Sequence, residues 1–259
     1  MNWIILALLA PALWAITNVL DKIVVTRYIK NYYTIAIIFG LSNFIALLFY
    51  PLAEIELKFW PMLASILAGI LSLAAAMPYY KALYLEEASK LVPIWNSVPL
   101  VVLIMEWLFL SQILSLNFYI SFFLIIIGTF IISIEKVKGV ARITKATFLM
   151  LLSSVIYAIY TILSKYALLH LNFWQVFILI RISTGLSAIV LLLFIWRNIK
   201  IVNVDKTFFR IYGILIFITF IAVTLFDYAL VDGYASMVTV IAGIQSVFVL
   251  IYALILSTW

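Results

Sequence analysis

Three ionisable residues lie deep inside long apolar segments of this 259-residue chain: Glu106, Asp227 and Arg181. An ionised side chain at the centre of a bilayer costs about 2.5–3.5 kcal/mol on insertion scales, so each needs a physical reason to be there. Glu106 and Asp227 are candidates for a proton or cation coupling site. Arg181 belongs to the same candidate coupling set, as a partner for either carboxylate or as a contact for a solute. The structural alternative places each carboxylate at a helix end or beside a neighbouring helix.

A second set of side chains has the character of a binding site for an amphipathic small solute. Aromatic rings contact apolar or cationic groups, and amide groups orient a ligand through hydrogen bonds. For any single ring, packing against lipid is the simpler explanation. With Asp227, the candidate substrate-binding residues are Trp14, Asn18, Tyr80, Trp95, Asn96, Tyr157, Tyr160 and Gln245.

Other polar residues favour structural roles. Lys22 and Lys165 lie near predicted helix ends, where a lysine side chain can extend to the membrane interface. His170 is the only histidine, and a single histidine makes neither a metal site nor a proton relay. Cysteine is absent, which excludes disulfides, thiolate metal sites and cysteine nucleophiles. We therefore expect no metal and no cofactor.

These residues belong to about nine apolar segments, each long enough to cross a membrane. Hydrophobic residues make up 68% of the chain and charged residues 10%, and the mean hydropathy is +1.28. A membrane-spanning helix needs about 20 apolar residues, and its backbone must satisfy its own hydrogen bonds in lipid. The sequence predicts an all-α polytopic membrane protein with spans at residues 3–24, 33–52, 60–80, 88–110, 115–134, 147–168, 173–196, 208–229 and 234–258.

The two halves of the chain resemble each other. Residues 13–22 align with residues 156–165, and the Ala-Leu and Ala-Ser pairs within 82–89 align with those within 229–236. Two matches in the same order favour an internal duplication. Tyr80 then aligns with Asp227, so we expect both to face one central cavity.

Loop charge indicates that the two copies have opposite orientation. Basic residues follow the first span (Lys22, Arg27 and Lys30), but only Lys58 follows the second. In the second half the pattern reverses: no basic residue separates spans six and seven, and four lie between spans seven and eight (Arg197, Lys200, Lys206 and Arg210). Basic loops stay in the cytoplasm, so the sequence predicts an inverted repeat with the N-terminus outside.

The predicted organisation has three parts. Residues 1–134 form a first repeat of five helices, residues 135–146 a basic connecting loop, and residues 147–259 a second repeat of four helices. The fifth span has no counterpart in the second repeat. We expect truncation of the chain, in preference to natural loss of the tenth helix.

The chain resembles the EamA-type carriers of the drug/metabolite transporter superfamily, which are built from two five-helix repeats. The resemblance rests on Ala10-Pro11-Ala12-Leu13-Trp14-Ala15 with Asn18 and Lys22, on Tyr79-Tyr80-Lys81-Ala82-Leu83, on Glu86-Glu87-Ala88-Ser89-Lys90-Leu91-Val92-Pro93, and on Pro99. Two departures stand out: Gln112 occupies a position where members often have Glu, and Ser246 replaces the proline of the second repeat. Ten-helix members usually have both termini in the cytoplasm, unlike the orientation that loop charge predicts here.

The resemblance implies a secondary carrier or exporter that moves a small metabolite by alternating access: an amino acid, nucleoside, sugar or organic cation. Translocation of a lipid-linked sugar and a non-transporting membrane scaffold remain alternatives. The sequence contains no G-x-x-x-x-G-K-[ST], H-E-x-x-H or G-x-S-x-G motif, so no enzymatic activity is expected. The expected partners are the lipid bilayer and a small-molecule substrate, with a homodimer left open and nucleic acid excluded. Isoleucine richness is typical of AT-rich prokaryotic genomes, which suggests a prokaryotic inner membrane.

Overall fold

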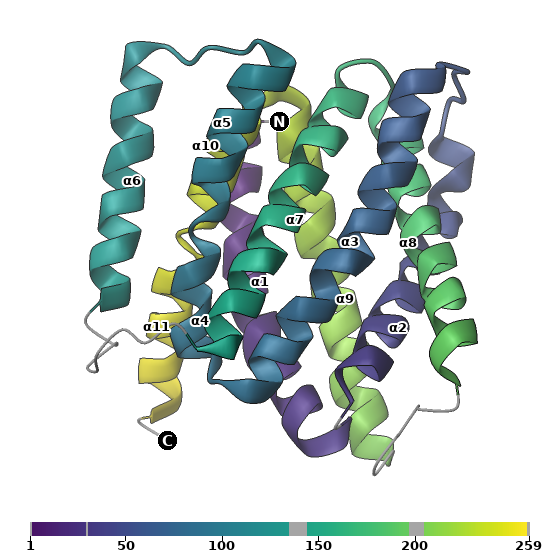
Figure 1. Ribbon diagram of the computed structural model, residues 1–259, viewed down its shortest axis with the longest axis vertical. Helices are drawn as coiled ribbons and strands as arrows, with labels where there is room; N and C mark the ends of the chain where they lie inside the picture. The colour runs from purple at the N-terminus through teal and green to yellow at the C-terminus, as the bar shows by residue number, and fades with distance from the viewer. Residues whose placement is uncertain (1, 30, 135–143, 197–204, 258–259) are drawn as a thin grey trace.

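The computed structural model describes residues 2–29, 31–134, 144–196 and 205–257, and every regular element within these ranges is a helix. The prediction of an all-α fold is therefore confirmed. Figure 1 shows the helices side by side in one bundle. In chain order they are α1 (Trp3–Ile23) with a π-helical extension η1 (Val24–Tyr28), α2 (Tyr32–Ser42) with a 3₁₀ extension η2 (Asn43–Leu52), α3 (Phe59–Leu85), α4 (Ala88–Trp95), α5 (Val98–Leu110), α6 (Leu116–Ile134), α7 (Lys145–Leu168), α8 (Phe173–Ile195), α9 (Lys206–Asp232), α10 (Ala235–Ala242) and α11 (Gln245–Ser257). The predicted connecting loop lies outside the described residues as far as residue 143.

Among the helices of the described residues, five begin at a polar residue whose side chain caps the first turn. In each, a side-chain oxygen accepts a hydrogen bond from a backbone N–H two or three residues further on, which satisfies a donor that has no partner within the helix. The capping residues are Asn2, Asn31, Thr144, Asn172 and Asp205.

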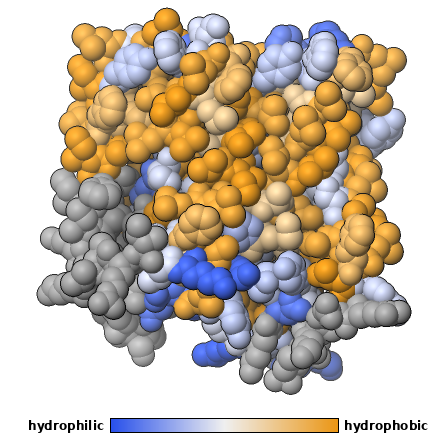
Figure 2. Space-filling view, viewed as in Figure 1, coloured by the Kyte–Doolittle hydropathy of each residue, from blue (hydrophilic) through white to orange (hydrophobic). Residues whose placement is uncertain are grey.

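Within the described residues, six helical segments are long and apolar enough to cross a membrane: Trp3–Tyr28, Tyr32–Leu52, Phe59–Leu85, Lys145–Leu168, Phe173–Ile195 and Lys206–Asp232. Three shorter apolar stretches cover the other expected spans: Val98–Leu110, Leu116–Gly128 and Ala235–Val249. Figure 2 shows an apolar face bordered by more polar residues at its upper and lower edges. This distribution suits a molecule surrounded by lipid.

Two of the expected spans are broken near their middle. The segment 88–110 divides into α4 and α5 at Asn96–Ser97, and the segment 234–258 divides into α10 and α11 at Gly243–Ile244. Pro99 explains the first break, because a proline has no N–H to donate and its ring clashes with the preceding turn. The second break has no proline within it. The two breaks are 147 residues apart (243 − 96), the offset that also relates residues 82–89 to 229–236.

The sequence-equivalent helices α1 and α7 run in opposite directions, and the contacts of each with its neighbours show this. Along α1 and α9, Tyr28 contacts Phe208 at 5.6 Å between ring centroids and Trp14 contacts Phe226 at 5.1 Å, so these helices are antiparallel. Along α3 and α7, Lys58 Nζ donates to the His170 carbonyl at 2.8 Å, near the start of one helix and the end of the other. The end of α1 lies beside the end of α3, because Lys22 Nζ donates to the Glu86 carbonyl at 2.9 Å. Consequently α1 and its sequence equivalent α7 are antiparallel (Figure 1).

Small residues allow α3 to approach its neighbours closely, as membrane helices require. Thr184 Oγ1 on α8 donates to the Gly69 carbonyl at 2.9 Å, and Ser153 Oγ on α7 donates to the Ala75 carbonyl at 2.7 Å. A Cβ atom added to Gly69 would lie 2.6 Å from Cβ of Ser183, too close for any real contact. This packing places α3 at the centre of the bundle, where it forms one wall of the site.

Candidate functional site: a central cavity

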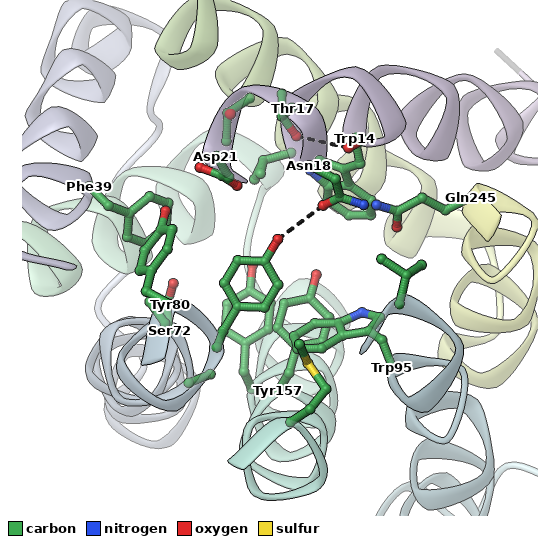
Figure 3. A pocket seen from close by; sticks show the side chains of 18 of the residues that line it. Trp14, Thr17, Asn18, Asp21, Phe39, Ser72, Tyr80, Trp95, Tyr157 and Gln245 are labelled. Carbon is green, nitrogen blue, oxygen red and sulfur yellow. Dashed lines mark hydrogen bonds between the residues drawn. The ribbon is translucent and has the colours of Figure 1, made fainter. Parts of the chain in front are cut away.

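A cavity of about 160 Å³ lies between the two halves of the chain. Figure 3 shows Phe39, Asp21, Tyr80 and Ser72 at one end and Trp14, Asn18, Gln245 and Trp95 at the other. The lining side chains come from α1, α2, α3, α4, α7, α8, α9 and α11, so both repeats contribute. The described lining residues are Trp14, Thr17, Asn18, Asp21, Phe39, Ser72, Ala75, Ala76, Tyr79, Tyr80, Val92, Trp95, Met150, Tyr157, Tyr160, Arg181, Thr219, Val223 and Gln245.

The structure brings most of the candidate binding residues to this cavity. Asn96 does not line it; its amide donates to Ser246 Oγ at 3.1 Å and joins the two helix breaks. Asp227 lies directly behind the wall. The seven candidates that do line the cavity are Trp14, Asn18, Tyr80, Trp95, Tyr157, Tyr160 and Gln245.

A buried ionic network supports one side of the cavity. Arg181 forms a salt bridge with the Asp227 carboxylate, and Tyr160 donates its hydroxyl to Asp227 Oδ1 at 3.0 Å. Arg181 also donates to Asn43 Oδ1 at 3.4 Å, and its guanidinium lies 5.0 Å from the centroid of the Phe177 ring. Of the two carboxylates considered as partners for Arg181, the structure selects Asp227. This pairing offsets part of the cost of burying the guanidinium charge.

Glu106 has a different position. Its carboxylate accepts hydrogen bonds from the backbone N–H of Ala235 at 2.6 Å and of Ser236 at 3.0 Å, and also from the Ser236 hydroxyl. These N–H groups belong to the first turn of α10, whose positive end favours an anion. Glu106 is 1% exposed and does not line the cavity, so its geometry is that of a helix cap contributed by another helix.

Lys22 and Lys165 have matching contacts. Lys22 Nζ donates to the Leu83 carbonyl at 2.7 Å, and Lys165 Nζ donates to the Leu230 carbonyl at 2.8 Å. Leu83 and Leu230 are themselves equivalent under the offset of 147. Each lysine therefore caps the C-terminal end of a helix in its own repeat, α3 for Lys22 and α9 for Lys165. The prediction that the Lys165 side chain extends to the membrane interface is wrong, because this residue is only 3% exposed.

Aromatic rings form a continuous wall. Trp95 lies 5.7 Å from Tyr79 and 5.0 Å from Tyr157 between ring centroids, and Tyr157 lies 5.0 Å from Tyr160. Tilted and edge-to-face arrangements of this kind are the favourable ones for aromatic pairs. They hold the rings in fixed orientations around the cavity.

Sequence reasoning missed several lining residues, and Asp21 is the most important of them. Trp14, Thr17, Asn18 and Asp21 all line the cavity, at the spacing that places residues on one helix face. An aspartate one turn beyond Asn18 on the face that carries Trp14 was the available signal. Tyr79, Phe39 and Ser72 gave no comparable signal, since each is unremarkable within an apolar helix.

A helical membrane protein with two related halves around a central polar and aromatic cavity has the architecture of a small-molecule transporter. The model of the EamA-like transporter family matches residues 1–134 and again residues 144–258. The chain therefore belongs to the EamA-like transporter family. It is an integral membrane protein of the drug/metabolite transporter superfamily with two family repeats.

The fold has a counterpart among solved structures. A chain titled "Crystal structure of protein" superimposes with a TM-score of 0.72 and 12% sequence identity, over 98% of this chain and 88% of that one. At this identity the likeness concerns the fold alone. No curated protein is significantly similar to this chain in sequence.

Proposed function

We propose that the protein is a secondary carrier that moves a small metabolite through the central cavity by alternating access. The cavity between the two repeats carries this proposal, because substrate sites of such carriers lie at the repeat interface beside discontinuous helices. Here the breaks at Asn96–Ser97 and Gly243–Ile244 lie beside the site, and Trp95 and Gln245, which flank them, line it.

In this proposal the chain forms inverted repeats with nine membrane spans and an external N-terminus. The antiparallel course of α1 and α7 and the equivalent breaks in the fourth and ninth segments support the inversion. The loop charges of the sequence support the orientation, since basic residues are retained on the cytoplasmic side.

The dimensions of the cavity favour a small solute. Its volume of about 160 Å³ is close to that of a protein cavity that admits a single benzene molecule, about 150 Å³. A lipid-linked sugar is much larger than this space. The solute therefore has roughly the size of one aromatic ring with a short substituent.

A ligand screen with two matched tryptophan variants tests the proposal. Purified protein is heated with amino acids, nucleosides, sugars and organic cations, and a ligand that binds only the folded form raises Tm. We expect one class to raise Tm in the wild type and in Trp107→Ala, but not in Trp95→Ala. Trp107 is 57% exposed on α5, away from the cavity, so its variant controls for loss of an indole ring.

The same ligand, radiolabelled, is then offered to proteoliposomes. Saturable uptake by the wild type and by Trp107→Ala, with uptake lost in Trp95→Ala, is the expected result. A ligand that stabilises Trp95→Ala as much as the wild type would show that binding occurs elsewhere. Binding without any uptake would favour the scaffold role over a carrier.

A further inference from the structure

We propose that the cavity selects small monovalent organic cations, with the ammonium group opposite Asp21 and the apolar part against the aromatic wall. This inference rests on the proposed carrier function and names the substrate class of the same site.

Asp21 is a carboxylate on the cavity wall that is not matched by a base. Its side chain is 9% exposed and lines the cavity. Among the described side chains, none of the basic residues forms an ion pair with it. The Tyr79 hydroxyl, which donates to the Asn18 amide oxygen at 3.0 Å, also lies beside the Asp21 carboxylate and is a neutral partner for it. A carboxylate removed from water without a cation is costly, and a bound ammonium group supplies the missing positive charge.

The charge balance of the site favours one positive charge. Asp21 and Arg181 are the described lining residues with an acidic or a basic side chain, and Arg181 is already paired with Asp227. The formal sum over these three residues is −1 (−1 + 1 − 1). A monocation brings the site to neutrality, a zwitterion leaves it unchanged, and an anion makes it more negative.

Asp21 has no acidic counterpart in the second repeat. Under the offset of 143 that relates residues 13–22 to 156–165, the counterpart of Asp21 is Ser164. Ser164 is buried and donates its hydroxyl to the Tyr160 carbonyl at 2.8 Å, so it adds no charge to the cavity. The negative site thus lies at one end of the cavity.

Aromatic faces complete the recognition of a cation. Phe39 and Tyr80 lie at the same end of the cavity as Asp21, and Trp14, Trp95 and Tyr157 extend along it (Figure 3). The π faces of such rings attract organic ammonium groups, most strongly where water is excluded. An anion gains nothing from this arrangement, because the negative π faces repel it.

One polar group at the other end remains available. Asn18 Nδ2 is buried and has no hydrogen-bond partner among the described residues. Since the Tyr79 hydroxyl occupies its carbonyl oxygen, this amide presents an N–H toward the end of the cavity that Gln245 lines. A cation with a hydrogen-bond acceptor a few bonds from its nitrogen can engage both ends.

The test compares four probes of similar size and different charge: benzylamine, benzyl alcohol, phenylacetate and phenylalanine. Binding to the purified wild type is measured by calorimetry and uptake is measured in proteoliposomes. We expect benzylamine to bind at least about ten-fold more tightly than the other three, because a fully desolvated charge pair contributes strongly to affinity. Phenylalanine or phenylacetate binding as tightly as benzylamine would overturn the cation class and leave the carrier function intact.

Substitution of Asp21 locates the charge. Asp21→Asn should weaken benzylamine binding at least about ten-fold, and Asp21→Glu should retain most of it. Asp232→Asn, at an exposed position outside the cavity, makes the same chemical change and should have no effect. Unchanged benzylamine affinity in folded Asp21→Asn would remove this residue from recognition. If none of the probes nor any compound of the wider screen binds, the proposed function itself fails.

Discussion

Arg181 places a positive charge in the middle of the bundle, and the Asp227 carboxylate is the group that makes this possible. Both side chains are about 4% exposed, so neither reaches water. The neighbouring hydroxyl of Tyr160 donates a second hydrogen bond to the Asp227 carboxylate. Removal of one member of a buried pair leaves the other charge without compensation, and this costs more than removal of both.

Asp227→Asn should therefore lower the free energy of unfolding by about 3–5 kcal/mol. The double variant Asp227→Asn/Arg181→Met removes the uncompensated charge and should recover a large part of that loss. Both values are measured by titration with a denaturing detergent in mixed micelles. A double variant that is less stable than Asp227→Asn would contradict the interpretation of Arg181 and Asp227 as a mutually neutralising pair.

For single residues, the sequence predicts which side chains have a polar role better than it predicts where those side chains lie. Ionisable and amide residues within apolar segments are informative because lipid makes them costly, and most of the candidates do line the cavity. Glu106 satisfies the same criterion, yet it caps α10. Asp21 was missed because it lies near the end of the first predicted span, where the membrane interface is the simplest explanation for an ionisable side chain, although it shares a helix face with Trp14 and Asn18.

Among the elements, α3 depends on small residues for its close contact with α8. Gly69 lies against α8, and an added Cβ would meet Cβ of Ser183 at 2.6 Å and the backbone N of Thr184 at 3.0 Å. Gly213 on α9 provides a natural comparison, because a Cβ added there meets nothing within 4 Å. The two glycines differ in their surroundings and not in their helical context.

Gly69→Ala should destabilise the protein by about 1–3 kcal/mol, because the extra methyl group forces α3 and α8 apart. Gly213→Ala should be neutral or slightly stabilising, since alanine is the better helix former. Thermal unfolding of the two variants in the same detergent compares them directly. Equal Tm values would mean that the α3–α8 contact is loose.

The breaks within the fourth and ninth predicted spans are the feature of the helices that the sequence did not predict. Helix length follows from the apolar runs, and both broken segments read as continuous spans in the sequence. Pro99 is a visible signal for the first break, whereas the second depends on packing: Gly243 lies against Asn96, with 3.4 Å between an added Cβ and Asn96 Oδ1. Contacts between segments that are distant in sequence are not encoded in local propensity.

The orientation of the whole molecule can be measured because the chain has no cysteine. Leu57 is 86% exposed between η2 and α3, and Arg27 is exposed in η1, at the opposite end of the bundle. With the N-terminus outside, Leu57→Cys should react with an impermeant maleimide in intact cells, and Arg27→Cys only after the membrane is opened. The reverse pattern would place the N-terminus in the cytoplasm.

The duplication was the most predictable property of the whole molecule. Short matches between the halves identified it, and the family model then matched each half separately. Which faces would enclose the cavity was less predictable, because that depends on how α1 meets α9 and how α3 meets α7. Those contacts join residues about 80 to 230 positions apart, as Ser153 with Ala75 and Gly233 with Trp3 illustrate.

The cap that Glu106 places on α10 makes the two halves energetically unequal. In the alternating-access cycle proposed above, the opposite state would need the mirror-image contact, in which residue 253 caps the start of α4. That residue is an alanine, which has no oxygen to offer in its side chain. That state would forgo the hydrogen bonds that Glu106 makes here, so the proposed carrier would rest, when empty, mostly in the present state, and each cycle would have to overcome that preference.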